Sequence, residues 1–279
     1  GLELGQGRRP RSRVGCAPGE FDLEFERGER RAQFVRGVRG EAPLRGERIV
    51  EPRKQRVQAA GERLQLKADL DRAIAGMKRP PRAVFTTHSE SSTGVVNDVR
   101  ALAAVAHDHG AVICVDAISG LGAVDLPQDE WGVDVVVSGS QKSLMCPPGL
   151  AFASVSERAM SLAAERPAGR FYFDWAKTAA GQGKEPPATA FTPAVSLFMA
   201  LDVALGMILD EGLETVFERH AILARAARAG IEAIGLDRFG ADDPDANVVT
   251  AARLPDEIDG ARVPKLMRDR YGVTVAGGQ

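Results

Sequence analysis

The chain alternates short, continuously apolar runs with segments of helical periodicity, and this alternation restricts the fold more than any other feature. Apolar runs occupy residues 83–87, 111–115, 133–138 and 150–155, and apolar side chains recur at helical spacing over residues 99–109. Runs of this length are typical of strands buried in a parallel sheet. Strand, helix and strand in this order predict βαβ units and an α/β domain with a mainly parallel sheet.

A further group of elements follows these strands, and those after residue 210 predict a smaller domain. The group consists of two long helices, a strand, a short helix and a final strand, at residues 194–209, 213–234, 247–251, 260–271 and 273–275. We therefore expect the large domain to span residues 67–210 and a small α+β C-terminal subdomain to span residues 211–279.

Residues 1–66 differ in character from the rest of the chain. They are crowded with Arg and Gly, and neither the helical nor the strand period persists in them. From Lys67 onward the periodicity begins, with helical spacing at 68–74. We expect the first segment to be disordered or translated out of frame. A nucleic-acid-binding arm is disfavoured because Glu and Asp are interspersed among the arginines.

The composition excludes several classes of partner. With a net charge of −2 and 44% hydrophobic residues, the chain gives no electrostatic reason to expect nucleic acid or a membrane surface. No apolar run approaches the ~20 residues of a membrane span, and the N-terminus has no apolar signal segment. The three cysteines, Cys16, Cys114 and Cys146, have no metal-ligand spacing. We expect a cytoplasmic protein without a metal site.

Polar, reactive side chains follow three of the expected strands. The first strand runs into segment 88–94 (HSESSTG), the second ends at Asp116, and the third leads to Lys142 through Ser138–Gln141. Ligands of parallel α/β sheets bind at the carboxyl ends of the strands. Pyridoxal phosphate requires this set of groups: a lysine for the imine, a carboxylate beside the pyridine nitrogen, and hydroxyls for its oxygens.

Each of these residues also has an ordinary structural interpretation. A lysine in a Gly-Ser loop is usually a solvated surface charge, and an aspartate after a strand is often a helix cap or turn residue. His88 can be a satisfied polar residue at a strand end, and the hydroxyls after it can be turn formers. From spacing alone, therefore, an enzyme and a protein without catalysis remain open.

Four motifs together resemble the class V aminotransferases of pyridoxal-phosphate fold type I. They are segments 88–95, 115–122, 138–142 and 147–149. Within the family, the resemblance is to the alanine–glyoxylate, serine–glyoxylate and serine–pyruvate aminotransferase group, and it covers about residues 67–279. It implies a fold-type-I large domain, incomplete on its N-terminal side, and a truncated small subdomain.

The resemblance also implies a role for each matching residue. Lys142 would form the imine with the cofactor and later carry the substrate proton, while Asp116 would pair with the pyridine nitrogen. Ser91 would reach the ring oxygen, and Gln141 the ring oxygen or the phosphate. His88 is expected near the ring. Family sites form at the interface of a homodimer, so Thr192, or Thr189 beside it, would bind the phosphate of the partner's cofactor.

The implied reaction is ping-pong transamination from a small amino acid, alanine or serine, to an oxo acid such as glyoxylate. Two family features are absent: the Gly/Ser-rich phosphate turn, which we do not find before Ala68, and the arginine that would follow Gln279 and bind the substrate carboxylate. Two alternatives therefore stay open. In the first, the chain is an inactive fragment that cannot hold the cofactor. In the second, it is a desulfurase or another lyase of the same fold type, although Cys146 is a poor candidate for the persulfide carrier that a desulfurase needs.

Overall fold

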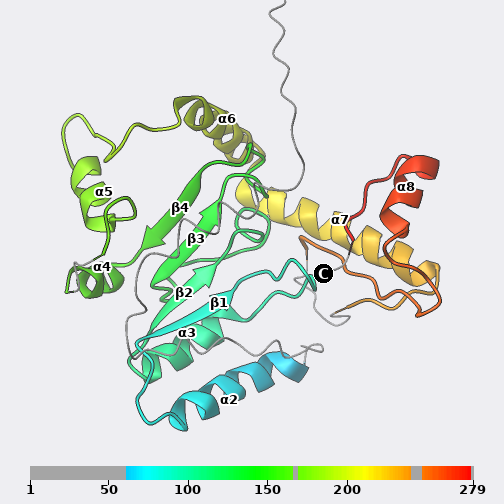
Figure 1. The fold of residues 1–279 in the computed structure, drawn as a ribbon, viewed down its shortest axis with the longest axis horizontal. Coiled ribbons are helices and arrows are strands. Elements are labelled where there is room, and N and C mark those ends of the chain that lie inside the picture. The colour runs from blue at the N-terminus through cyan, green and yellow to red at the C-terminus, as the bar shows by residue number, and fades with distance from the viewer. Residues whose placement is uncertain (1–60, 166–168, 240–246, 278–279) are drawn as a thin grey trace, which may run out of the picture. The chain divides into compact units, whose positions relative to one another are not determined.

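The sheet of the computed structural model has four strands in the order of the sequence: β1 (Ala83–Thr87), β2 (Val112–Asp116), β3 (Val135–Gly139) and β4 (Ala151–Val155). The structure describes residues 61–165, 169–239 and 247–277 (Figure 1). Segment 1–60 lies outside these ranges. The expectation that the Arg/Gly-rich residues 1–66 are disordered or out of frame therefore falls largely outside the described residues. All elements below belong to the unit Gln55–Gln279.

The sheet is mixed. Strands β1, β2 and β3 pair in parallel, as the sequence predicts, whereas β3 and β4 pair antiparallel. The reason is the length of the connection, because a parallel crossover requires a dozen or more residues and usually a helix. Residues 140–150 between β3 and β4 contain no helix and are too few for such a crossover, so the chain turns back beside the strand it has just left.

Helix α3 (Val99–Asp108) covers one face of the sheet. Asp98 caps its N-terminus by accepting from the Ala101 N–H at 3.0 Å, and Gly110, with a φ of +71°, ends it. The apolar stripe of α3 includes Leu102 and Val105 and packs against Ile113 and Val115 of β2. Each such side chain, when fully buried, contributes about 1.5–3 kcal/mol to stability.

Helix α2 (Gly61–Ala75) lies on the outer side of α3 and inserts Leu66, Leu70 and Ile74 into the same core (Figure 1). It begins before the expected start of periodicity near Lys67. The opposite face of the sheet is more open than predicted. Phe85 of β1 is 77% exposed, and Cys114 of β2 is only half-buried, so the second strand is not buried on both faces.

The remaining helices are α4 (Glu157–Ala164), α5 (Trp175–Gln182), α6 (Val195–Glu211), α7 (Leu213–Ala233) and α8 (Val263–Tyr271). The sequence predicts α6, α7 and α8 within a few residues but not α4 and α5. A second core cluster joins Ile208 of α6 and Val216 of α7 to Leu144 and Phe152. This cluster fixes the two long helices against the loop after β3 and against β4.

Two expected strands do not form. Segments 247–251 and 273–275 contain no strand, and the one ladder contact nearby is an isolated bridge between Arg238 and Ala252. The backbone of the first segment makes a different contact: a Cβ on Gly94, whose φ is +77°, would lie 2.3 Å from the Val249 carbonyl oxygen. The segment therefore packs against the loop after β1 instead of pairing with a neighbour. None of the described helices is long and apolar enough to cross a bilayer.

A buried carboxylate joins the amino-terminal ends of the central strands. Asp134 is 2% exposed and accepts from His107 Nε2 at 3.0 Å, the Ile113 N–H at 2.9 Å and the Ser156 hydroxyl at 3.1 Å, while Arg158 Nε lies 3.5 Å away. These partners come from the end of α3, from β2 and from the start of α4. One side chain thus holds three elements together at the edge opposite the strand-end loops.

We expect Asp134→Asn to lower the free energy of unfolding by about 1–3 kcal/mol. Both carboxylate oxygens accept hydrogen bonds, and in the variant an amide nitrogen, which cannot accept, would replace one of them. Urea unfolding followed by circular dichroism measures the change. Asp129→Asn, at an exposed position in the same segment, is the matched control and should stay within ~0.5 kcal/mol of the wild type. Equal stability of the two variants would contradict this account.

Candidate active site

The carboxyl ends of β1, β2 and β3 meet at one edge of the sheet. Thr87, the last residue of β1, is aligned with Asp116, the last of β2, and Asp116 is aligned with Val137 of β3. The loops that follow carry the residues singled out by the sequence. We name them the serine loop (residues 88–97), the aspartate loop (116–124) and the lysine loop (140–150).

Asp116 is half-buried at the start of the aspartate loop. Its Oδ1 accepts from the Ile118 N–H at 2.9 Å, and its backbone oxygen accepts from the His88 N–H at 2.7 Å. In the described part of the chain, the second carboxylate oxygen has no hydrogen-bond partner. The loop geometry therefore fixes the orientation of the carboxylate while it leaves one oxygen for a cationic group such as a protonated ring nitrogen.

Ser119 connects all three loops. Its hydroxyl lies 2.5 Å from the hydroxyl of Ser91 in the serine loop, and its backbone oxygen accepts from the Ser143 hydroxyl in the lysine loop at 3.4 Å. Ser119 is buried, whereas Ser91 is exposed. Ser91, which the sequence predicts as a site residue, thus lies beside the aspartate loop. Lys142 immediately precedes Ser143, the residue of the lysine loop that contacts Ser119.

The lysine loop is closed around Ser140, which is fully buried. The Ser140 hydroxyl donates to the Pro147 oxygen at 2.6 Å, and its backbone oxygen accepts from the Cys146 N–H at 3.0 Å. Within the loop, the Met145 N–H donates to the Lys142 oxygen at 2.9 Å, and Met145 has a φ of 59°. A non-glycine residue in the left-handed region is strained, and such strain persists where the surroundings over-determine the conformation.

Lys142 and Gln141 are exposed within this closed loop. The Lys142 amine is thus accessible to a ligand. The Gln141 side chain folds back over the preceding backbone, because a Cβ on Gly139 would lie 2.7 Å from its Oε1. That position therefore requires glycine if Gln141 is to keep this orientation.

His88 is placed differently from the other expected residues. Its side chain is 1% exposed, and its Nδ1 has no hydrogen-bond partner among the residues that the structure describes. The ring lies against Gly120, where an added Cβ would be 2.4 Å from Nδ1. Burial lowers the pKa of His88, and the backbone and charge of Asp125 oppose this effect only in part. His88 supports the aspartate loop from behind, and its direct contact with a cofactor remains a prediction.

Thr192 is exposed in the segment that precedes α6. The first turn of that helix lies next to the lysine loop, since a Cβ on Gly149 would be 2.6 Å from Leu197 Cδ1. The structure therefore brings the helix start close to the lysine loop, while the expected role of Thr192 in phosphate binding remains a prediction.

The side chains at this edge fit the cofactor that the sequence predicts. They present an accessible amine, a carboxylate with one oxygen that has no partner within the described ranges, and a pair of hydroxyls, all on loops of adjacent strands. The sequence reasoning missed Ser119 as a site residue. The available signal was its position three residues after Asp116, in a turn that the same motif contains.

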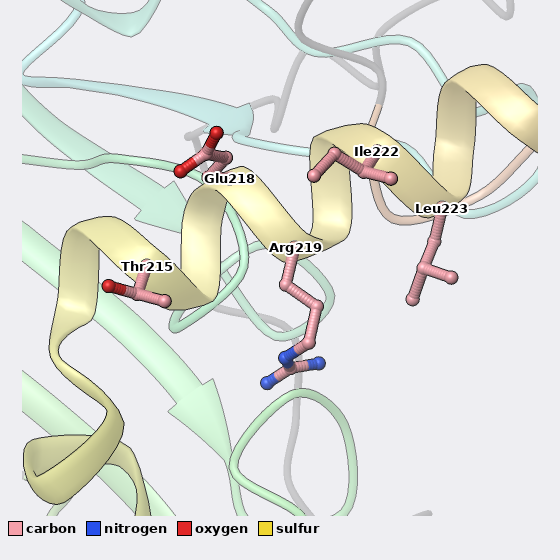
Figure 2. Close-up of a pocket in the computed structure, with 5 residues that line it drawn as sticks. All are labelled: Thr215, Glu218, Arg219, Ile222 and Leu223. Atoms are coloured by element: carbon pink, nitrogen blue, oxygen red, sulfur yellow. The ribbon is translucent and has the colours of Figure 1, made fainter.

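A separate hollow lies on the surface of α7 (Figure 2). It measures about 190 Å³, and all five lining residues come from this one helix: Thr215, Glu218, Arg219, Ile222 and Leu223. The guanidinium of Arg219 is already paired with both carboxylate oxygens of Glu211, at 2.6 and 3.0 Å. The hollow contains none of the residues expected to react.

We expect the burial of His88 to make stability depend on pH. The folded pKa lies below the unfolded value of about 6.5, so the contribution of His88 is intact above that pH and decreases as the pH falls, because the unfolded chain binds the proton more readily. Urea midpoints measured from about pH 6.5 downward should decline less steeply with falling pH in His88→Gln than in the wild type. His220→Gln on α7 is the control, and an unchanged slope in His88→Gln would refute the assignment.

Comparison with known proteins places this chain in a family. The family model for class-V aminotransferases matches residues 47–279. A protein of Synechococcus sp. named soluble hydrogenase, small subunit, is 45% identical over 203 residues, which cover 72% of this chain and 52% of that protein. Serine–glyoxylate aminotransferase of Arabidopsis thaliana is 34% identical over 200 residues, covering 71% of this chain and 50% of that protein.

A solved structure agrees with these relatives. Ureidoglycine–glyoxylate aminotransferase of Bacillus subtilis superposes with a TM-score of 0.69 at 32% identity, over 76% of this chain and 55% of that one. The chain spans about half the length of the curated relatives it matches. Since the family match extends over most of the chain and includes all three strand-end loops, the chain belongs to the class V aminotransferases, a family of pyridoxal-phosphate enzymes.

Proposed function

We propose that this protein transfers an amino group from a small amino acid, alanine or serine, to an oxo acid such as glyoxylate, with pyridoxal phosphate as cofactor. The observation that carries the proposal is the convergence of Lys142, Asp116 and Ser91 on the loops of three adjacent strands. The choice of substrates is supported by relatives whose names specify glyoxylate as acceptor, with serine, ureidoglycine or aspartate as donor.

Each residue has a chemical task in this proposal. The cofactor, when bound, supplies an electron sink that stabilises negative charge on the α-carbon of the substrate. The Lys142 amine would hold the cofactor covalently and would move the proton at that α-carbon. The Asp116 carboxylate keeps the ring nitrogen protonated, because a nearby negative charge favours the charged form of that nitrogen. Ser91 and Gln141 orient the oxygens of the cofactor.

We also propose that the protein works as a homodimer, in which Thr192 contacts the cofactor of the partner subunit. The exposed apolar surface of α6 supports this proposal. Met199 and Val203 are 68% and 64% exposed on this helix, close in sequence to Thr192. Exposed apolar patches of this kind are typical of subunit interfaces.

Replacing the lysine tests the proposal directly. Purified wild-type protein should bind pyridoxal phosphate with the visible absorbance band of a lysine imine, and it should transaminate glyoxylate with alanine or serine. Lys142→Ala should lose the band and lower the rate by several orders of magnitude, since the covalent attachment is removed. Lys184→Ala, at an exposed lysine outside the lysine loop, is the matched control. A wild-type protein without transamination would reject the proposed substrates, and Lys142→Ala protein that keeps the band would reject the assigned lysine.

The charge of Asp116 provides a second test. Asp116→Asn retains the shape of the side chain but removes the negative charge that stabilises the ring proton, so we expect kcat to fall about 10²- to 10³-fold while the protein still binds the cofactor. Steady-state kinetics and the visible spectrum measure the two effects separately. Asp256→Asn at an exposed position should behave like the wild type. A normal kcat in Asp116→Asn would show that the carboxylate does not face the ring nitrogen.

A further inference from the structure

The shortest hydroxyl contact at the strand-end edge joins two residues that lie on different loops. Ser91 Oγ and Ser119 Oγ are 2.5 Å apart, and either atom can be the donor. Ser119 is only 7% exposed, whereas Ser91 is exposed. Of the two hydroxyls, therefore, Ser91 can meet a ligand, and Ser119 can act on that ligand only through Ser91.

The direction of this contact determines whether Ser91 has a hydrogen to offer to a ligand. A serine hydroxyl has one hydrogen to donate and two lone pairs that accept. If Ser91 donates to Ser119, it has no hydrogen left for a ligand oxygen. If Ser119 donates to Ser91, the Ser91 hydrogen is free to point outward at an anionic oxygen. Hydrogen bonds in such a chain polarise one another and strengthen the outer bond.

Ser119 is held in place from two other directions. Its backbone oxygen accepts from the Ser143 hydroxyl in the lysine loop. The next residue, Gly120, lies against the buried ring of His88, where no side chain could fit. These contacts hold the Ser119 backbone, and burial restricts its side chain. The Ser119 hydroxyl therefore loses little conformational entropy when it binds Ser91, so it can orient a hydroxyl that is otherwise exposed.

We propose that Ser119 is a positioning residue that donates its hydroxyl hydrogen to Ser91 and thereby directs the Ser91 hydrogen to the ring oxygen of pyridoxal phosphate. This inference rests on the proposed function, because it requires that the cofactor ring lie beside Ser91. It adds a residue to the site, Ser119, whose effect on the cofactor passes through one hydroxyl pair.

The test is a double-mutant cycle of Ser91→Ala and Ser119→Ala, with pyridoxal phosphate as the ligand. Its two readouts are the dissociation constant of the cofactor and the pH midpoint of its visible band. We expect Ser119→Ala to raise the dissociation constant about 2- to 10-fold, as the loss of one hydrogen bond implies. The pH midpoint should rise, because the ring oxygen becomes more basic when the bond donated to it weakens.

Both effects of Ser119→Ala should disappear when Ser91 is already alanine, since the buried hydroxyl then has no route to the ring. Effects of equal size in both backgrounds would show a purely structural role and overturn the inference. So would an unchanged midpoint in Ser119→Ala. Ser92→Ala is the matched control, because the Ser92 hydroxyl belongs to the same loop but donates to Glu90 at 2.8 Å.

Two further outcomes separate this inference from the function on which it rests. A wild-type protein that never forms the visible band overturns the proposed function and the inference with it, whereas a normal band with no coupling overturns the inference alone. If Ser119→Ala protein is unstable, urea unfolding of the cofactor-free single and double variants measures the coupling energy between the two hydroxyls directly. A coupling energy of zero between Ser91 and Ser119 also counts against the proposal.

Discussion

The candidate site depends on the parallel register of three short strands. Thr87, Asp116 and Val137 stand side by side in β1, β2 and β3, so the chain leaves all three strands at the same edge. A shift of one residue in one strand would turn Asp116 to the other face of the sheet, because side chains alternate along a strand. The pairing of the backbone is therefore what brings a carboxylate, a lysine and a serine from distant parts of the sequence to one place.

This register is fixed at the opposite edge of the sheet. There the buried carboxylate of Asp134 accepts hydrogen bonds from the end of α3, from β2 and from the residue that caps α4. On the covered face, the apolar stripe of α3 matches the buried positions Ile113 and Val115 of β2. The amino-terminal edge thus supplies stability through buried, satisfied groups, and the carboxyl-terminal edge is left to carry exposed and strained groups.

The sequence predicts those parts of the structure that depend on local pattern. Strands β1 to β4 and helices α3, α6 and α7 lie within a few residues of the expected ranges, because the apolar runs and helical periods extend over the whole element. Helices α4 and α5 have eight residues each, which is too short for a clear period. The expected strand at 247–251 fails because an apolar run forms a strand only beside a partner edge, and Val249 packs against Gly94 instead.

The site shows the same division between local and tertiary information. Sequence motifs indicate Lys142, Asp116 and Ser91, because their chemistry and their positions after strands can be read along the chain. The pairing of Ser91 with Ser119 cannot be read in this way, since it arises where two loops meet 28 residues apart. The buried ring of His88 behind Gly120 is likewise a tertiary contact, and its exposure could not be inferred from its place after β1.

The conformation of the lysine loop depends on both local and tertiary contacts. Ser140 holds the two sides of the loop together, and Met145 keeps a strained left-handed conformation between them. Between these residues, Leu144 is buried in the cluster that includes Ile208 of α6 and Val216 of α7. Helices that follow the sheet in sequence therefore hold the loop from one side, and Ser119 contacts it from the other through Ser143. The Lys142 backbone is thus fixed by the sheet and the helices together, while its flexible side chain remains accessible to a ligand.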